Sequence, residues 1–152
     1  MCKRKIYNIV KEVIGLTIKN DIVPLWDNGT DKLYLFAVSD DSQYKYISGK
    51  PCITFGVAYE NKKYKGCDSF TLFDHFYDEI LDAMKNIYRE LNGSFRLDDN
   101  GADTDGYVDF EMKNGRLHVE GRLGATFSSY SLAFEFEADQ TLLGTLIQNL
   151  AF

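Results

Sequence analysis

The feature that most constrains this chain is the dipeptide Asn114-Gly115, which lies between two segments of alternating apolar and polar residues. Asn-Gly is the strongest short-range signal for a two-residue β-hairpin, because both residues tolerate the positive φ angles of a type I′ turn. We therefore predict that residues 107–112 and 116–123 pair as antiparallel strands. Any fold of this chain must accommodate that hairpin.

The turn also fixes which residues face each other, because a two-residue loop allows one register. Counting outward from the turn, the predicted opposite pairs are Lys113 and Arg116, Glu111 and His118, Asp109 and Glu120, and Tyr107 and Arg122. These side chains share one face of the sheet, and the apolar side chains share the other. Two carboxylates, those of Asp109 and Glu120, are thus predicted to lie opposite each other. Such a pair costs up to roughly 1 kcal/mol unless a cation or solvent screens it.

The hairpin is followed by a third segment of the same kind. Residues 130–137 alternate between apolar and polar side chains, so we predict a meander of three strands. Phe110, Val119 and Phe134 then point to one side of it. That side must be covered by other elements, because a sheet buries its apolar face against a second layer.

Two segments with a helical spacing of apolar residues are candidates for the second layer. Residues 72–92 carry the longer stripe, which begins at a capping box formed by Thr71 and the Asp three residues later. Residues 140–150 carry the shorter stripe, with Asp139 as the predicted N-cap. We expect helix 72–92 to cover the apolar face of the sheet and helix 140–150 to pack nearby.

The N-terminal half contains shorter signals. Residues 5–13 have the apolar spacing of a helix, although their β-branched side chains would also suit a strand. Runs rich in β-branched and aromatic residues predict further antiparallel strands at 33–38, 44–47, 53–59 and 95–97. The predicted fold class is α+β, an antiparallel sheet of about six to seven strands with helices packed on one face. With 152 residues and no linker or repeat, the chain is expected to be a single domain, residues 1–152.

Charge is divided unevenly along the chain. Residues 1–66 contain 11 Lys and Arg against 7 Asp and Glu, and residues 67–152 contain 6 against 16, giving nets of +4 and −10. Surfaces that bind nucleic acid are normally basic, so we expect neither DNA nor RNA as a partner. An acidic surface favours a basic partner and accelerates its association.

Several classes of protein are disfavoured by what the sequence lacks. No apolar run reaches the ~18 residues needed to span a bilayer, and the N-terminus does not have the pattern of a signal peptide, so we expect a cytoplasmic protein without membrane association. The 3 cysteines form no Cys-x-x-Cys pair, which favours reduced thiols. Motifs of hydrolases, nucleotide-binding loops, zinc proteases and dinucleotide sites do not occur, so we expect no enzyme and no cofactor.

Two arrangements could still carry chemistry. The loop 98–106 is rich in Asp and Gly, but aligning it with an EF-hand places a Gly and a Met at two essential ligand positions, so we expect no metal there. His118 opposite Glu111 could exchange protons. An exposed cross-strand pair of this kind is usually only a weak ion pair, so we expect no catalytic residue.

Residues 73–150 contain an ordered series of motifs. After a long amphipathic helix come Gly-Ser-Phe-Arg-Leu at 93–97, Asp-Gly-Tyr-Val at 105–108 and Gly-Arg-Leu-His-Val-Glu-Gly at 115–121. The series closes with Leu-Ala-Phe-Glu-Phe-Glu-Ala-Asp-Gln-Thr at 132–141, which is its most specific part. This half of the chain resembles the WapI-type immunity proteins of bacterial polymorphic toxin systems.

The resemblance implies a cytoplasmic protein that binds and blocks the toxic C-terminal domain of a cognate secreted effector, often a nuclease. An acidic surface would suit the basic, phosphate-holding active site of a nuclease. The alternative is an acidic secretion chaperone, which would bind an effector segment through apolar grooves as a homodimer. We expect an immunity protein that is a monomer.

The residues expected to bind the partner are the carboxylates of the acidic loop and of the polar sheet face, with one aromatic anchor. They are Asp98, Asp99, Asp103, Asp105, Tyr107, Asp109, Glu111 and Glu120. Between Asp98 and Glu111 the chain has six acidic residues and no Lys or Arg, so we expect no cation from within this segment to neutralise them. Tyr is common at interface centres because it buries a large area at little cost in rotamer entropy.

Overall fold

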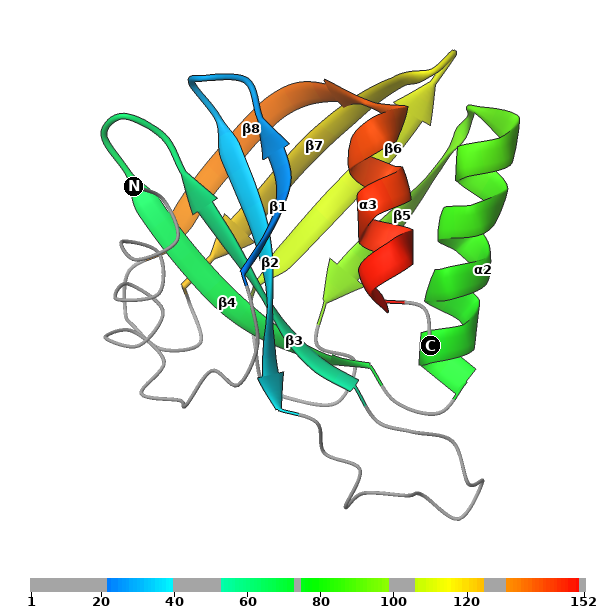
Figure 1. Ribbon diagram of the computed structural model, residues 1–152, viewed down its shortest axis with the longest axis horizontal. Coiled ribbons are helices and arrows are strands. Elements are labelled where there is room, and N and C mark those ends of the chain that lie inside the picture. Colours follow the sequence, from blue (N-terminus) through cyan, green and yellow to red (C-terminus); the bar gives the residue numbers. More distant parts are fainter. Residues whose placement is uncertain (1–21, 40–52, 73–74, 99–105, 125–130, 151–152) are drawn as a thin grey trace.

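The computed structural model describes residues 22–39, 53–72, 75–98, 106–124 and 131–150. These residues form two antiparallel sheets of four strands, in the orders β1-β2-β3-β4 and β5-β6-β7-β8, here called the N-terminal sheet and the C-terminal sheet (Figure 1). The elements are β1 (Val23–Asp27), β2 (Lys32–Ser39), β3 (Ile53–Glu60), β4 (Lys65–Leu72), α2 (His75–Glu90), β5 (Gly93–Asp98), β6 (Tyr107–Lys113), β7 (Arg116–Leu123), β8 (Leu132–Asp139) and α3 (Gln140–Leu150).

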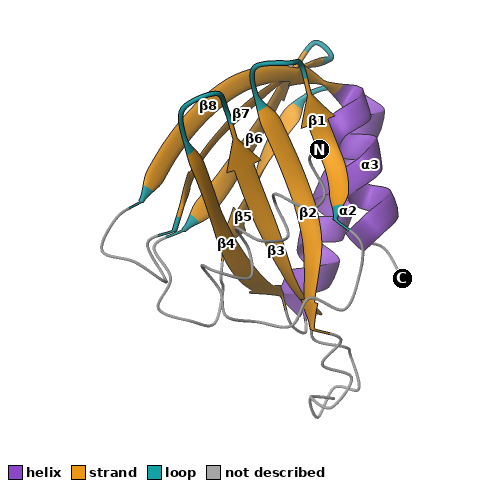
Figure 2. Cartoon of the chain, turned by 60° about the vertical axis from the view of Figure 1, so that its left-hand side comes forward, coloured by secondary structure: helices purple, strands orange, loops and turns teal. Residues whose placement is uncertain are grey.

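The α+β class is confirmed, but the strands form two sheets rather than one sheet of about six to seven strands. The apolar face of the C-terminal sheet packs against the N-terminal sheet, and both contribute to one hydrophobic core. Helices α2 and α3 lie side by side along one side of the sheets, where α2 contacts β5 and α3 contacts β1 (Figures 1 and 2). The expectation that helix 72–92 covers the apolar sheet face is confirmed only in part, because α2 contacts β5 while the N-terminal sheet packs on the same core.

The hairpin at the centre of the C-terminal sheet has the predicted register. Each of the four opposite pairs derived from the turn is present between β6 and β7. Asn114 and Gly115 have φ angles of 51° and 79°, as a type I′ turn requires. Burial alternates along both strands, with Phe110 and Val119 on the buried side. The turn and the alternation therefore sort every side chain of this hairpin onto the correct face.

Gly115→Ala should lower the free energy of unfolding by about 1–2 kcal/mol, because an L-residue is strained in the left-handed region. A Cβ at this position would meet nothing closer than Cδ1 of Leu91 at 3.9 Å, so the cost comes from the backbone rather than from a clash. Urea unfolding monitored by circular dichroism measures it. Asn114→Gly is the control, since glycine tolerates the same turn, and should change stability by less than about 0.5 kcal/mol. Equal losses in both variants would contradict this account.

The end of α2 is tied to the hairpin turn. The helix ends at Glu90, and the next residue, Leu91, has a left-handed φ of 57°. The amide of Leu91 donates to the carbonyl of Ile87 at 2.9 Å. The amide of Gly115 donates to the Leu91 carbonyl at 3.1 Å, which satisfies a backbone acceptor at the helix end.

The start of α2 differs from the prediction. Thr71 belongs to β4, so the predicted capping box at the start of this helix is wrong.

Helix α3 begins and ends where the sequence predicts. The amide of Thr141 donates to Oδ1 of Asp139 at 2.8 Å, which confirms Asp139 as the N-cap. The apolar stripe faces the core and buries Leu142, Leu143, Leu146 and Leu150. No helix among the described segments is long and apolar enough to cross a membrane.

The N-terminal sheet was predicted less completely. Strands 33–38 and 53–59 are confirmed as parts of β2 and β3, whereas the helix at 5–13 and the strand at 44–47 lie outside the described residues. Strands β1 and β4 were not predicted.

Strand β4 contains a fully buried carboxylate, Asp68. It accepts hydrogen bonds from the amides of Ser69 at 3.0 Å and Gly124 at 3.2 Å, and the second of these joins the two sheets. Gly106 passes so close that a Cβ there would lie 2.1 Å from Oδ2 of Asp68. The glycine before β6 is therefore required by the packing of this carboxylate.

Candidate protein-binding site

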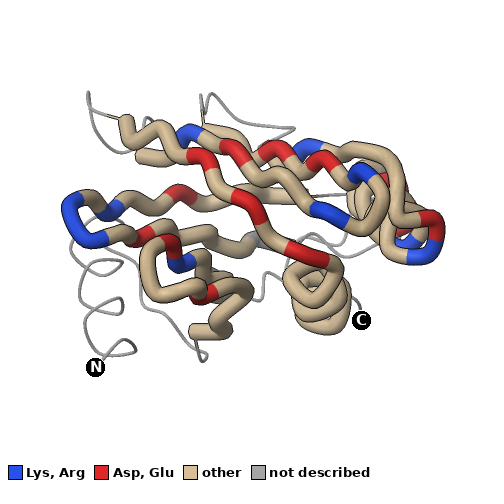
Figure 3. Tube along the Cα trace, turned by 90° about the horizontal axis from the view of Figure 1, so that it is seen from above, with Lys and Arg blue, Asp and Glu red and all other residues tan. Residues whose placement is uncertain are grey.

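The outward face of the C-terminal sheet, here called the charged face, carries most of its polar side chains. Burial alternates along β5 to β8, so the residues between the buried positions point to solvent. Its acidic residues are Asp98, Asp109, Glu111, Glu120, Glu135, Glu137 and Asp139. Its basic residues are Arg96, Lys113, Arg116 and Arg122, with His118 near the centre. Acidic positions (red) recur on neighbouring strands, with basic positions (blue) among them (Figure 3).

Strand pairing aligns three carboxylates across this face. Asp109 lies opposite Glu120, as predicted, and Glu120 lies opposite Glu135 on its other side. We call these three residues the carboxylate row. Arg96 lies opposite Asp109 on β5 and ends the row with a positive charge. Like charges in directly opposite positions repel, so Glu120, with a carboxylate on each side, is the least favourable position in the row.

Arg96 neutralises one end of the row. Its Nε and Nη2 atoms each donate to a carboxylate oxygen of Asp109 at 2.7 Å, and these hydrogen bonds raise the pKa of the guanidinium. The guanidinium also lies 4.3 Å from the centroid of the Tyr107 ring, a cation–π geometry. Tyr107, the predicted aromatic anchor, is thus partly covered by the guanidinium of Arg96, a contact that was not predicted from the sequence.

Lys113 neutralises a second predicted site residue. The Nζ atom of Lys113 lies 2.9 Å from Oε1 of Glu111. The hydrogen bond that Lys113 donates to this carboxylate raises the pKa of the lysine. The segment itself supplies no cation, as expected, but cations that flank it pair with two of its carboxylates. Arg96 and Lys113 lie just before and just after it. Exposed pairs of this kind contribute little to stability and exchange readily with other partners.

The other predicted site residues separate into two groups. Asp98 ends β5 opposite Tyr107, where its side chain is half-buried. The loop carboxylates Asp99, Asp103 and Asp105 lie outside the described residues, so the expected absence of a metal in that loop stays a prediction. Asp98, Tyr107, Asp109, Glu111 and Glu120 therefore form the described part of the predicted site, and all five belong to the charged face.

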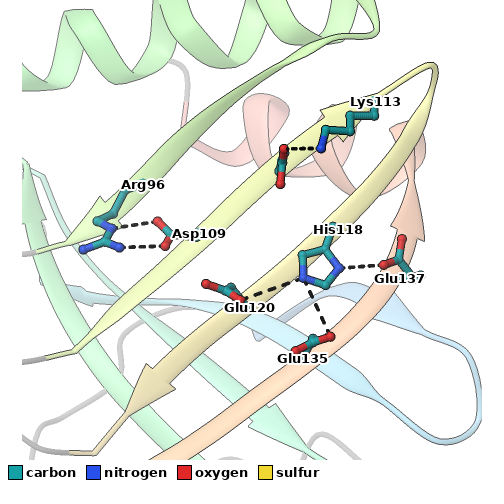
Figure 4. A network of polar contacts seen from close by, with 8 residues as sticks. Arg96, Asp109, Lys113, His118, Glu120, Glu135 and Glu137 are labelled. Carbon is teal, nitrogen blue, oxygen red and sulfur yellow. Dashed lines mark hydrogen bonds and ion pairs between the residues drawn. The ribbon is translucent and has the colours of Figure 1, made fainter.

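His118 is the centre of a polar network on this face (Figure 4). Its Nδ1 lies 2.6 Å from Oε1 of Glu137, and because a carboxylate only accepts, Nδ1 carries the proton. Its Nε2 lies 3.9 Å from a carboxylate oxygen of Glu120 and 3.9 Å from one of Glu135. The hydrogen bond to Glu137, followed by the charges of the nearby carboxylates, raises the pKa of His118.

Three residues of the charged face had no role predicted from the sequence. Glu135 and Glu137 alternate with buried residues of β8, and Arg96 alternates with those of β5, so their outward direction could be predicted. Their partners could not be predicted, because residues 124–131 and 99–106 connect the strands through loops too long to set a register. Glu111 lies opposite His118 as expected, but the imidazole bonds to Glu137 on the other neighbouring strand.

One group on the charged face has the composition of a metal site. Donor atoms of His118, Glu120 and Glu135 all lie within 4.8 Å of one another.

The free thiol of Cys67 has no such surroundings. Cys67 is buried in β4, and burial raises its pKa to about 12. A thiol with so little thiolate at neutral pH is a poor ligand and a poor nucleophile.

The charged face is hollowed only gently. One open depression is lined by Ser94, Arg96, Asp109, Glu111, His118 and Glu120. A second, next to it, is lined by Glu111, Lys113, Arg116, His118 and Glu137. Such shallow, charged surfaces suit a protein partner better than a small apolar ligand, which needs an enclosed pocket.

Comparisons of the chain with protein-family models, with curated proteins and with solved structures find no match. The resemblance of residues 73–150 to WapI-type immunity proteins therefore stays a prediction from sequence motifs.

Glu137→Gln should lower the pKa of His118, because it removes the strongest interaction that favours the imidazolium. A raised pKa in the folded state stabilises the protein below the unfolded value of about 6.5, and this contribution is lost as the pH rises through the folded value. The variant should therefore be less stable than the parent near pH 6 and equally stable near pH 9. NMR titration of the His118 ring in EDTA buffer measures the shift. Glu111→Gln is the matched control, and an equal shift in both would contradict the assignment.

Proposed function

We propose that this chain is an immunity protein that acts in the cytoplasm, where it binds and neutralises the toxic C-terminal domain of a cognate secreted effector. The contact surface in this proposal is the charged face of the C-terminal sheet. The observation that carries it is the carboxylate row, Asp109, Glu120 and Glu135, which is aligned on adjacent strands of an open sheet face.

The charges of the row favour a basic partner. Asp109 is bound by Arg96, whereas the only cationic group that approaches Glu120 or Glu135 among the described residues is His118, at 3.9 Å. Two carboxylates held opposite each other without a strong cation are mildly destabilising in the free protein. A lysine or arginine of the partner, placed between them, would remove that repulsion. A nuclease site that holds phosphate has such residues, so blocking it is the form of inhibition that we propose.

The scaffold of the face supports the same proposal. The row lies on paired strands whose opposite sides are buried in the core, so its backbone positions are fixed before binding. Arg96 and Tyr107, stacked at one end, are residue types common at interface centres. A partner would therefore meet a rigid acidic platform with one ordered aromatic and guanidinium pair beside it.

The alternative, a secretion chaperone, needs an apolar groove for an effector segment. Within the described parts of the chain, the large apolar side chains that are exposed are Tyr64 at 59% and Tyr88 at 41%, and neither belongs to the charged face. The polar character of that face favours the immunity function and a monomer. Mass measured by size-exclusion chromatography with light scattering separates the two functions, because the chaperone would be a homodimer.

The test is co-expression with the C-terminal domain of the protein encoded immediately upstream. If the proposal is correct, the chain protects the cell and co-purifies with that domain. The association rate constant should fall about tenfold or more when salt is raised from roughly 0.05 M to roughly 0.5 M, because steering by the acidic face is screened. A lack of protection, or a stable homodimer that carries an upstream secretion substrate, would refute the immunity function.

A further inference from the structure

We propose that His118, Glu120 and Glu135 form a zinc-binding site on the charged face, with Glu137 as the residue that positions the histidine. This inference does not rest on the proposed function. It concerns the isolated chain, so zinc binding and toxin neutralisation can each fail without the other.

The strand geometry brings three ligands to one point. His118 and Glu120 are two residues apart on β7 and therefore point to the same side, and Glu135 lies directly opposite Glu120 on β8. Zn²⁺ in proteins has bonds of about 2.0–2.2 Å to nitrogen and oxygen, so tetrahedral ligands lie roughly 3.3–3.6 Å apart. The 3.9 Å separations from Nε2 to both carboxylates exceed this by a few tenths of an ångström, and the donor atoms of all three residues lie within 4.8 Å of one another. Rotation of the terminal carboxylate torsions, which are soft, supplies that movement.

The histidine is already oriented for metal binding. The hydrogen bond from Nδ1 to Glu137, at 2.6 Å, places the proton on Nδ1 in the neutral ring. The lone pair of Nε2 then points toward Glu120 and Glu135, as the close-up shows (Figure 4). Histidine ligands of metals almost always donate their other N–H to a carboxylate or carbonyl, which fixes the tautomer and increases ligand basicity. This arrangement distinguishes the cluster from a plain acidic patch.

The chemistry of the donors selects the ion. An imidazole nitrogen with two carboxylates suits Zn²⁺ and similar transition metals, whereas Ca²⁺ and Mg²⁺ prefer oxygen ligands alone. Glu137 on β8 adds a further negative charge beside the three ligands, whereas Asp109 and Glu111 on β6 are paired with Arg96 and Lys113. The side chains of His118 and Glu135 are 31% and 70% exposed, so solvent would complete the coordination of a three-ligand site.

Calorimetric titration of the EDTA-treated full chain with Zn²⁺ tests the site. We expect saturable binding of one ion per chain, accompanied by a change in the ¹⁵N shift of His118 Nε2. The double variant Glu120→Gln, Glu135→Gln and the single variant His118→Gln should each weaken binding at least 100-fold. Glu137→Gln should weaken it 10–100-fold while one ion still binds, because it acts through the histidine.

Glu111→Gln is the matched control, since it removes one charge from the same face, opposite His118, without removing a ligand. Its affinity should stay within about threefold of the parent, and excess Ca²⁺ should not displace Zn²⁺. Zinc that binds the double variant as tightly as the parent lies elsewhere on the chain and overturns the proposal. The absence of saturable binding up to about 1 mM Zn²⁺ overturns it as well.

Discussion

Replacing both Glu120 and Glu135 by lysine should weaken binding of the cognate toxin domain by about 100-fold or more. The change converts two attractive positions of the carboxylate row into repulsive ones, and like charges brought together across an interface cost several kcal/mol. Since each 1.4 kcal/mol is a factor of ten, about 3 kcal/mol is enough for this loss. The fold should survive, because the lysine at position 120 lies opposite Asp109 and relieves one repulsion, and the repulsion between the two lysines only replaces the one between the two glutamates.

The matched control is Glu79→Lys with Asp82→Lys on α2. Both positions are exposed, and the pair changes the net charge by the same amount on a different element. Surface plasmon resonance in EDTA buffer, which excludes any bound metal, compares the two variants. The control should bind within about threefold of the parent. An equal loss in both variants would assign the effect to overall charge, and full binding by the Glu120 and Glu135 variant would reject the charged face as the contact surface.

The hairpin shows what could be predicted from the sequence. Asn114-Gly115 leaves one register, and alternation then assigns each side chain to a face, so strand limits, opposite pairs and buried residues of β6 and β7 follow without any tertiary information. Helix α3 is a second case, because Asp139 and the leucine stripe are local signals. These predictions succeed where neighbouring residues decide the structure.

The division into two sheets could not be predicted in this way. Strand β4 interrupts its apolar pattern with Asp68, whose burial is compensated by amides that include Gly124 on the other sheet. A residue stabilised by a partner 56 positions away gives no local signal. Thr71, at the end of the same strand, also fits a helix cap by spacing alone. The omission of β4 then left the N-terminal sheet, which packs against the apolar face of the C-terminal sheet, incomplete.

The candidate site was predicted in part for the same reason. The opposition of Asp109 and Glu120 follows from the turn, but the cation that binds Asp109 and the carboxylate that binds His118 belong to β5 and β8. Both outer strands are joined through loops longer than the turn, so their register depends on the packing of the core. The centre of the charged face is therefore set by contacts between strands that the sequence does not place in register.

Phe134→Ala should lower the free energy of unfolding by about 3–5 kcal/mol, a large fraction of the 5–15 kcal/mol typical of a domain. Phe134 is 7% exposed and stacks on Tyr59 of the N-terminal sheet, with ring centroids 4.4 Å apart and planes at 8°. Its ring also fills the space above Gly121, where a Cβ would lie 2.6 Å from the ring. Removing the ring leaves a cavity between the sheets that a glycine and a rigid tyrosine cannot fill.

Phe134→Leu is the control, because it keeps most of the volume, and it should cost less than about 1.5 kcal/mol. Urea unfolding measures both variants, and a loss below about 1 kcal/mol for Phe134→Ala would contradict the packing of the two sheets at this residue.

Phe134→Ala also tests whether the packing of β8 on the core positions the side chains around His118. Phe134 packs β8 against the core. The outward-facing residues that follow it on the same strand, Glu135 and Glu137, contact His118. If β8 shifts when the ring is removed, the pKa of His118 should fall toward its ordinary value, whereas Phe134→Leu should leave it raised.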